Sequence, residues 1–144
     1  MLYAYTRDED RHSLILDSLE EGILLIEANG QIIYANHSMV SILGISEESI
    51  IGRCLSELPI NILVCLGLTR EDAESLIKHL RQDDFSFIEK FESIFNNPIK
   101  RQTLQRKALP FRYQTKHPRG LLLVLYDVTK EQQIAQARDI FSET

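Results

Sequence analysis

Apolar and polar positions follow two different periods along this chain, and the periods divide it into helices and strands. Residues 8–19 are predicted to form a helix. Two short apolar runs follow, Ile23–Glu27 and Gln31–Ala35. The Asn29–Gly30 dipeptide between them predicts a hairpin with a type I′ turn, because both central residues of that turn need positive φ.

Capping residues predict two short helices after the hairpin. Asn36 can cap a helix through Leu43, and Gly44 is suited to end it in the left-handed conformation. Ser46 can cap the next segment, "EESII", which Gly52 closes in the same way.

A longer amphipathic helix is predicted after an irregular apolar segment at 60–68. Thr69 with Asp72 can open this helix. Its apolar residues recur at i, i+3, i+4 and i+7, so one face packs and the other is charged. These residues are Ala73, Leu76, Ile77 and Leu80.

The remainder of the chain is typical of strands. Strands are predicted at 85–95, 101–114 and 121–128, with turns at 96–98 and 117–120. Strands at both ends and helices between them favour an α+β domain. We expect a five-stranded antiparallel sheet with the short helices gathered on one face.

Length and charge limit the possible functions. The 144 residues suffice for one domain with its own core. A net charge of −5 argues against a dedicated nucleic-acid binder. Residues 100–119 hold seven Lys or Arg and no acid, but they alternate with apolar residues. We interpret this run mainly as the solvated face of a strand rather than as a phosphate-binding surface.

Cysteines and apolar runs indicate the compartment. Cys54 and Cys65 are too few for a disulfide framework, and no Cys/His cluster suggests zinc. The N-terminal residues lack the features of a signal peptide. The longest apolar run, at 60–68, is about half the ~20 residues of a membrane span. We therefore expect a cytoplasmic segment without direct membrane contact, whether or not its parent is membrane-anchored.

Two stretches of the chain resemble a PAS sensory domain. Residues 14–58 carry the hairpin pattern "G-x-x-x-x-(D/E)-x-x-G-x-I-x-Y-x-N" and the helix pattern "G-(I/Y)-x-x-E-E-x-I-G-R". Residues 108–133 are similar to the last two strands of that family and its closing Asp-(Ile/Val)-Thr motif, here Asp127, Val128 and Thr129. The resemblance implies a flanking segment at 1–13, a PAS domain at 14–128, and the start of a C-terminal signalling helix at 129–144.

A PAS domain is expected to be a sensor that does no chemistry itself and passes a conformational bias to an output domain. No glycine-rich phosphate loop or phosphoacceptor histidine pattern occurs, so the chain is not expected to be an enzyme. The output domain is expected to belong to a sensor histidine kinase of a two-component system. The alternatives are a diguanylate cyclase, a transcription activator, or a ligand-free dimerisation module.

Cofactors of the family do not match these residues. Haem-binding relatives place their axial histidine near the start of the long helix, whereas His79 lies near its end and is interpreted as a residue of the charged face. Flavin-binding relatives carry a reactive cysteine at the position of Leu55, one residue after Cys54. We expect no cofactor.

A small apolar ligand stays an alternative to a filled core. In this architecture the pocket would lie between Leu76, Ile77 and Leu80 of the long helix and three strand residues. Those strand residues are Phe87, Phe91 and Leu109. Large apolar side chains with few polar groups among them favour close packing over a cavity.

The end of the last strand is the expected point of signal transmission. Thr129 and Gln132 fit the capping-box pattern for the following helix. The resemblance implies that Asp127 pairs with a basic residue of a neighbouring strand, either Lys107 or Arg112. Ile134, Ala137 and Phe141 follow at coiled-coil spacing, so we expect the helix to leave the domain rather than fold back on the sheet.

The N-terminal residues predict a homodimer. They spread apolar surface over more than one helix face, which one sheet does not cover completely, and an isologous contact is the usual remedy. The residues are Leu14, Ile15, Leu16 and Leu19.

Overall fold

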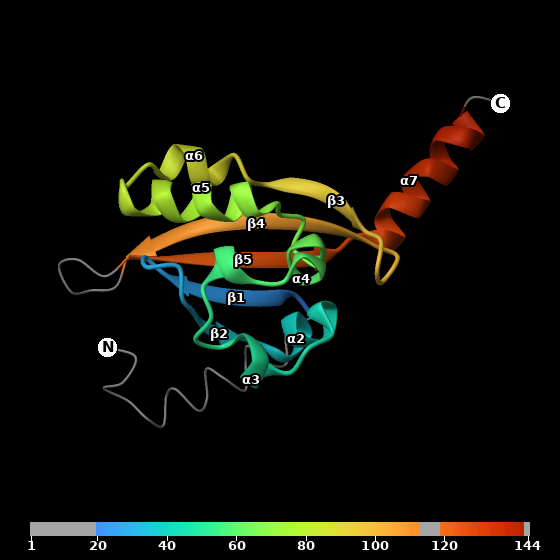
Figure 1. Ribbon diagram of the computed structural model, residues 1–144. Helices are drawn as coiled ribbons and strands as arrows, with labels where there is room; N and C mark the ends of the chain where they lie inside the picture. Colours follow the sequence, from blue (N-terminus) through green and yellow to red (C-terminus); the bar gives the residue numbers. More distant parts are fainter. Residues whose placement is uncertain (1–19, 113–118, 143–144) are drawn as a thin grey trace, which may run out of the picture.

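The computed structural model describes residues 20–112 and 119–142. The helix predicted at 8–19 lies outside them. Five strands form one antiparallel sheet in the order β2-β1-β5-β4-β3 (Figure 1). The α+β fold and the five-stranded antiparallel sheet are therefore confirmed. The strands are β1 Gly22–Glu27, β2 Ile32–Ala35, β3 Ser93–Asn97, β4 Gln102–Arg112 and β5 Arg119–Asp127.

Short helices fill the long connection between β2 and β3. The last helix, α7 (Thr129–Ser142), instead follows β5 directly and extends away from the sheet (Figure 1). The connecting helices are α2 His37–Leu43, α3 Glu47–Ile50, the 3₁₀ turn η2 Leu55–Glu57, α4 Ile60–Cys65, α5 Arg70–Arg81 and α6 Phe85–Glu89.

The strand predicted at 85–95 is wrong in its first half. Residues Phe85–Glu89 form α6, and only Ser93–Asn97 pair with β4. The Asp84 carboxylate accepts a hydrogen bond from the Phe87 amide at 3.3 Å and caps the helix, and Ile88 is fully buried. Aromatic residues favoured a strand, but the capping carboxylate and the burial of Ile88 select a helical turn.

The β1–β2 hairpin is present, but its predicted type I′ turn is wrong. Gly30 has φ 91°, whereas Asn29 is not in the positive-φ region. The Gly30 amide bonds to the Glu27 carbonyl at 2.8 Å, and the Glu27 amide bonds to the Gln31 carbonyl at 2.8 Å. The loop thus has three residues and ends in a left-handed glycine, which is the next most common hairpin connection.

The predicted caps of α2 are confirmed. Asn36 Oδ1 accepts hydrogen bonds from the amides of Met39 and Ile23, both at 2.9 Å, so the cap also joins α2 to β1. Gly44 ends the helix with φ 69°. Ser46 precedes α3 as predicted, but its hydroxyl contacts the Ser49 hydroxyl at 2.7 Å instead of capping the helix.

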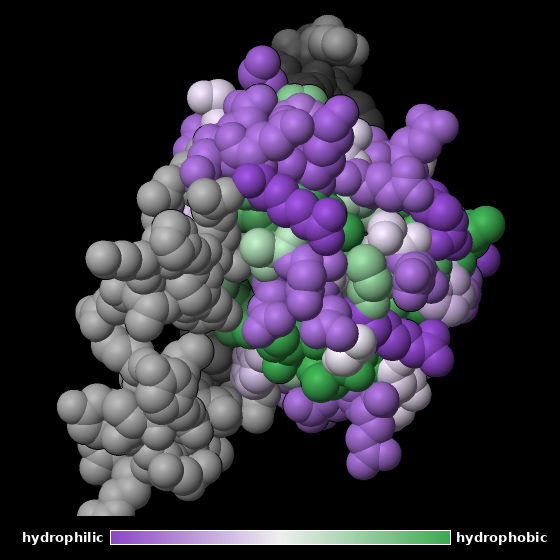
Figure 2. Space-filling model, turned by 60° about the vertical axis from the view of Figure 1, so that its left-hand side comes forward, coloured by the Kyte–Doolittle hydropathy of each residue, from purple (hydrophilic) through white to green (hydrophobic). Residues whose placement is uncertain are grey.

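Helix α5 is the main cover of the core. A capping box between Thr69 and Asp72 begins it, as the sequence predicted. Its four predicted apolar residues are all buried against the sheet. The polar face is exposed, and Figure 2 shows that polar side chains predominate on the visible described surface, with smaller apolar patches between them. Among the described residues, no helix is long and apolar enough to cross a membrane.

Candidate functional site

The sheet meets the exit helix at a junction built around Asp127, the last residue of β5. Asp127 Oδ1 accepts hydrogen bonds from the Thr129 amide at 2.9 Å and from the Thr129 hydroxyl at 2.5 Å. Asp127 Oδ2 accepts a hydrogen bond from Gln102 Nε2, at the start of β4, at 3.0 Å. One carboxylate therefore holds two strands and the first residue of α7 together.

These hydrogen bonds also set the ionisation of the carboxyl group. Partial burial alone would raise the pKa of Asp127. The hydrogen bonds from the Thr129 hydroxyl, the Thr129 amide and Gln102 outweigh that effect, so the pKa lies below its ordinary value. The junction therefore favours the ionised form of Asp127.

The capping box predicted for Thr129 and Gln132 is wrong. The Thr129 hydroxyl accepts a hydrogen bond from the Thr103 amide of β4 at 2.9 Å, and the Gln132 amide donates to the Val128 carbonyl at 2.9 Å. Thr103 of β4 lies one residue past the position opposite Asp127, where β5 ends, and its amide donates to the Thr129 hydroxyl. Asp127 caps the helix in place of Thr129.

The basic partner expected for Asp127 is also wrong. In the strand register Asp127 is opposite Leu104, which brings Gln102 within reach. Lys107 is opposite Val124, and its ammonium lies 5.6 Å from the Tyr126 ring centroid and 3.9 Å from the Glu92 carboxylate. Arg112 is at the other end of β4, opposite Arg119.

Helix α7 loses contact with the sheet soon after the junction. Residues 133–138 are all exposed, and Ile134 is 54% exposed. The helix therefore leaves the domain and does not fold back on it (Figure 1). An exposed apolar residue on such a helix is available to a partner helix.

The residues predicted to line a ligand pocket are only partly brought together. Leu76, Ile77 and Leu80 are buried under α5 as predicted. Phe87 belongs to α6 and Phe91 follows it, so both come from the helical side; their ring centroids are 5.4 Å apart. Leu109 is 45% exposed and alternates with buried Ala108 on β4, which places it on the opposite face of the sheet.

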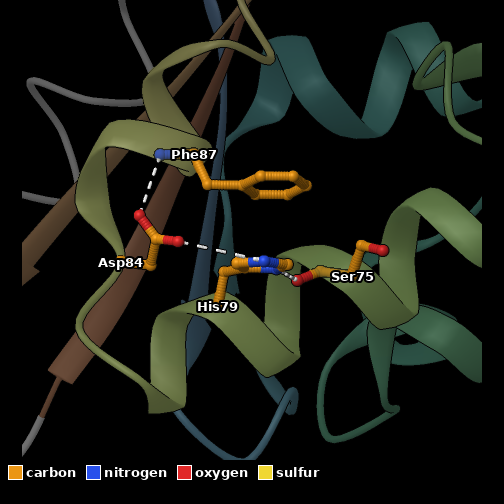
Figure 3. A network of polar contacts seen from close by, with 4 residues as sticks. All are labelled: Ser75, His79, Asp84 and Phe87. Carbon is orange, nitrogen blue, oxygen red and sulfur yellow. Dashed lines mark hydrogen bonds and ion pairs between the residues drawn. The ribbon is translucent and has the colours of Figure 1, made fainter.

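The interpretation of His79 as a residue of the charged face is wrong. Its ring stacks on the Phe87 ring with centroids 3.5 Å apart (Figure 3). Its Nδ1 lies 2.8 Å from the Ser75 carbonyl oxygen, and its Nε2 lies 3.9 Å from the carboxylate of Asp84. Because Asp84 also caps α6, this network fastens α6 to the last turn of α5.

A buried arginine was missed by the sequence interpretation. Arg106 is 6% exposed, and its guanidinium donates to three carbonyls: Phe91 at 3.0 Å, Leu66 at 3.1 Å and Gly67 at 2.6 Å. Burial lowers its pKa, and the charge of Asp72 opposes that shift. Arg106 therefore fastens two connecting segments to the sheet.

Other chemical features are modest. Burial raises the pKa of the Cys65 thiol, against smaller opposing effects of Asn97 and Lys100. In the described ranges, no group of three or more His, Cys, Asp or Glu could hold a metal ion. An open surface groove of about 360 Å³ lies between α5 and the hairpin loop. It is lined by Asn29, Cys54, Ser56, Glu74, Ile77, Lys78, Arg81 and Gln82.

Solved structures similar to this chain include PAS domains. The PAS domain of BvgS from Bordetella pertussis has a TM-score of 0.60 at 11% identity, over 95% of this chain and 98% of that one. The PAS domain of an HTR-like protein from Haloarcula marismortui has a TM-score of 0.52 at 17% identity, over 83% and 96%. A PAS domain from a two-component sensor histidine kinase has a TM-score of 0.52 at 12% identity, over 83% and 96%. The TM-scores show likeness of fold, and at identities this low they show the fold alone.

The sequence itself gives the family. No curated protein sequence matches this chain significantly. The family model described as the PAS fold matches residues 16–133, which is most of the chain and includes the hairpin, all the described helices up to α6, the sheet and the junction. The chain therefore belongs to the PAS-fold family of sensory domains.

Proposed function

We propose that this PAS domain transmits a conformational signal through the Asp127–Thr129 junction into α7 and on to a C-terminal output domain. The observation that carries the proposal is the single carboxylate that binds β4, β5 and the first turn of α7. A change in the relative position of the two strands alters the hydrogen bonds that orient the helix. Helix direction is then the quantity that the output domain reads.

We assign the output domain to a two-component sensor histidine kinase. The support is the likeness of fold to a PAS domain of such a kinase. The coding sequence that follows Thr144 tests this assignment. A phosphoacceptor histidine helix and an ATP-binding domain are expected there. A diguanylate cyclase or a DNA-binding activator in that place would replace the assignment with one of those outputs.

A cytoplasmic homodimer is part of the proposal. Leu14, Ile15, Leu16 and Leu19 supply its predicted N-terminal contact and lie outside the described residues. On α7, Ile134 is 54% exposed and Ala137 follows three residues later, which is one side of a helix-pairing seam. Two copies of α7 that pair along this seam would enter the output domains side by side.

The second candidate function is that of a ligand-free dimerisation module. It is favoured by the packing under α5, where Leu76, Leu80 and Ile88 are fully buried. Native mass spectrometry of the chain purified from cells, beside a denatured control, tests it. A single mass equal to that of the polypeptide is expected for the ligand-free module, whereas a retained small molecule would contradict it.

The main experiment replaces Asp127 by Ala in the full-length protein. The melting temperature should shift by only a few degrees, because Asp127 is exposed and at the sheet's end. Basal output, or the response to stimulus, should change. Glu131→Ala is the matched control, since Glu131 is another, exposed acid of the first turn of α7 and is not among the residues that hydrogen-bond Asp127, which are Gln102 and Thr129. Wild-type output in a domain that merely melts earlier would make Asp127 a structural residue.

A further inference from the structure

The two edges of the sheet are treated differently. The outer edge of β2 is covered by residues 52–55. The Ile32 amide bonds to the Arg53 carbonyl at 2.8 Å, the Gly52 amide bonds to the Ile32 carbonyl at 2.7 Å, and the Leu55 amide bonds to the Gly30 carbonyl at 2.8 Å. Proteins commonly cover an edge in this way, because unpaired strand edges recruit further strands.

The other edge is formed by two strands. Beyond Ser93, the first residue of β3, no described strand pairs with residues 107–112 of β4 on that side, and α6 packs against this strand. This part of β4 also contains Pro110, which has no amide hydrogen to donate. Proline on an edge strand hinders the addition of a further strand.

The outer edge of β3 has neither protection. The strand reads "SIFNN", without charge or proline, and its register with β4 is regular from Ser93 to Asn97. No backbone hydrogen bond joins β3 to a described segment other than β4. Ser93 and Asn96 are exposed, and Ile94 is 52% exposed. An exposed, uncharged edge with regular pairing on its inner side is suited to strand addition.

Charges on either side of β3 indicate what would pair with it. Glu89, Lys90 and Glu92 precede the strand and sum to −1, whereas Lys100 and Arg101 follow it and sum to +2. The Glu92 side chain is 53% exposed, and Arg101 is exposed. Antiparallel pairing of two copies brings the acidic start of each strand beside the basic end of the other. Parallel pairing would place like charges together.

We infer that β3 is an interaction surface for a second copy of this chain, which pairs with it antiparallel about a two-fold axis. A two-fold axis at Phe95 would place this half-buried ring opposite its own copy, as a cross-strand aromatic pair. The contact is isologous, so each copy supplies the same edge. It is independent of the proposed function.

The geometry separates this contact from pairing through α7. Asn97 is opposite Gln102, which binds Asp127 at the start of α7, so the exit helix begins at the Asn97 end of the edge. Antiparallel pairing puts the two exit helices at opposite ends of the joined sheets. Edge pairing is therefore a second association step, and it uses a surface that helix pairing leaves free.

Charge reversal tests the pairing on the whole chain. Sedimentation velocity over a concentration series would be run on the wild type, on Glu92→Lys, on Arg101→Asp, and on an equimolar mixture of the two variants. By the same sums, Glu92→Lys alone places +1 beside +2 at both ends of the contact, and Arg101→Asp alone leaves no net charge beside the acidic start, so each variant should weaken this association step at least about tenfold. In the mixture one end of the mixed pair is wild type, with −1 beside +2, and the other end places the charge introduced by Glu92→Lys beside the opposite charge introduced by Arg101→Asp, so association should recover toward the wild-type strength.

Two further variants guard the test. Glu48→Lys, an exposed acid on α3, has the same charge change as Glu92→Lys and should leave association unaffected. Ile94→Lys reverses no charge, but it should still weaken association because it adds a charge to the edge itself. Circular dichroism confirms that each variant is folded. Association equal in the wild type, both charge variants and their mixture, or no association at all by the wild type, would overturn the inference.

Discussion

Helices α5 and α7 begin with the same sequence pattern but use it differently. Thr69 and Asp72 close a capping box in which the Thr69 hydroxyl accepts from the Asp72 amide at 3.0 Å and Asp72 Oδ2 accepts from the Thr69 amide at 2.9 Å. At α7 the Thr129 hydroxyl is bound instead to Thr103 of the sheet, and Asp127 supplies the cap. Thr69 therefore caps its own helix, whereas Thr129 joins its helix to the sheet.

Burial separates the two helices as well. Four apolar residues of α5 are buried in the core, whereas residues 133–138 of α7 are all exposed. An isolated helix of α7's length is marginal in water. Its stability therefore depends on the junction at its start and on whatever partner it meets. We conclude that α5 is part of the folded core and that α7 is a connector.

Removal of an apolar side chain gives the largest expected difference between the helices. Leu80→Ala on α5 should lower the free energy of unfolding by about 2–5 kcal/mol, since Leu80 is fully buried. Ile134→Ala on α7 should change it by less than ~0.5 kcal/mol. Urea denaturation of the chain measures both, with Leu80→Met as the volume-conserving control. Similar losses at the two positions would mean that α7 packs on the domain.

Arg106 is expected to be as important for stability as the buried residues of α5, because it holds the segment that leads into this helix. Arg106→Ala leaves three carbonyls of the connecting segments without their donor and should cost about 2–3 kcal/mol in urea denaturation. Arg106→Lys should restore only part of the loss, because an ammonium does not reproduce the planar donor set of arginine. Full recovery with lysine would show that charge alone is needed at this position.

The two threonines are expected to differ in where their loss is felt. Thr69→Ala should cost about 1 kcal/mol and increase amide exchange in the first turn of α5 only. Thr129→Ala should increase exchange both in the first turn of α7 and at Thr103 of β4, since its hydroxyl joins the two. Hydrogen-exchange mass spectrometry resolves these segments. An effect of Thr129→Ala confined to α7 would remove the distinction between the helices.

Acidification should weaken the hydrogen bonds that Asp127 accepts at the start of α7. A carboxyl group whose pKa is lower in the folded protein stabilises the fold above its unfolded pKa, about 3.9, and this contribution is lost as the pH falls through the lower folded value. In an NMR titration the Thr129 amide should shift with a midpoint below about 3.9. Asp127→Asn should abolish this shift. A midpoint above that value would contradict the hydrogen-bonding described for Asp127.

Much of the fold follows from local sequence signals. The caps at Asn36, Gly44 and Thr69 and the apolar face of α5 are specified within a few residues, and the structure confirms them. The helix α6 is different, because its aromatic residues suit strands as well as helices. The capping carboxylate of Asp84 and the burial of Ile88 in the core determine that a helix forms here.

The site was less predictable because it depends on strand register. Asp127 was identified, but its partner Gln102 is fixed by the pairing of Leu104 with Asp127, which no local pattern specifies. The same holds for Thr103, whose amide donates to the hydroxyl of Thr129. Burial of Arg106 could have been predicted. It is two residues from both Leu104 and Ala108 in β4, so the period of a strand places its side chain on the same buried face.

The central claim is that Asp127 couples the sheet to α7, and a double-mutant cycle tests it most directly. Gln102→Ala, Asp127→Ala and the double variant would be compared with the wild type by amide exchange in the first turn of α7. The side-chain hydrogen bond of Gln102 goes to Asp127 of β5 and not to α7, yet its loss should speed exchange in α7 about fivefold, or ~1 kcal/mol, and should add nothing once Asp127 is gone. Unchanged exchange in Gln102→Ala, or effects that simply add in the double variant, would show that the sheet and the helix are not coupled through this carboxylate.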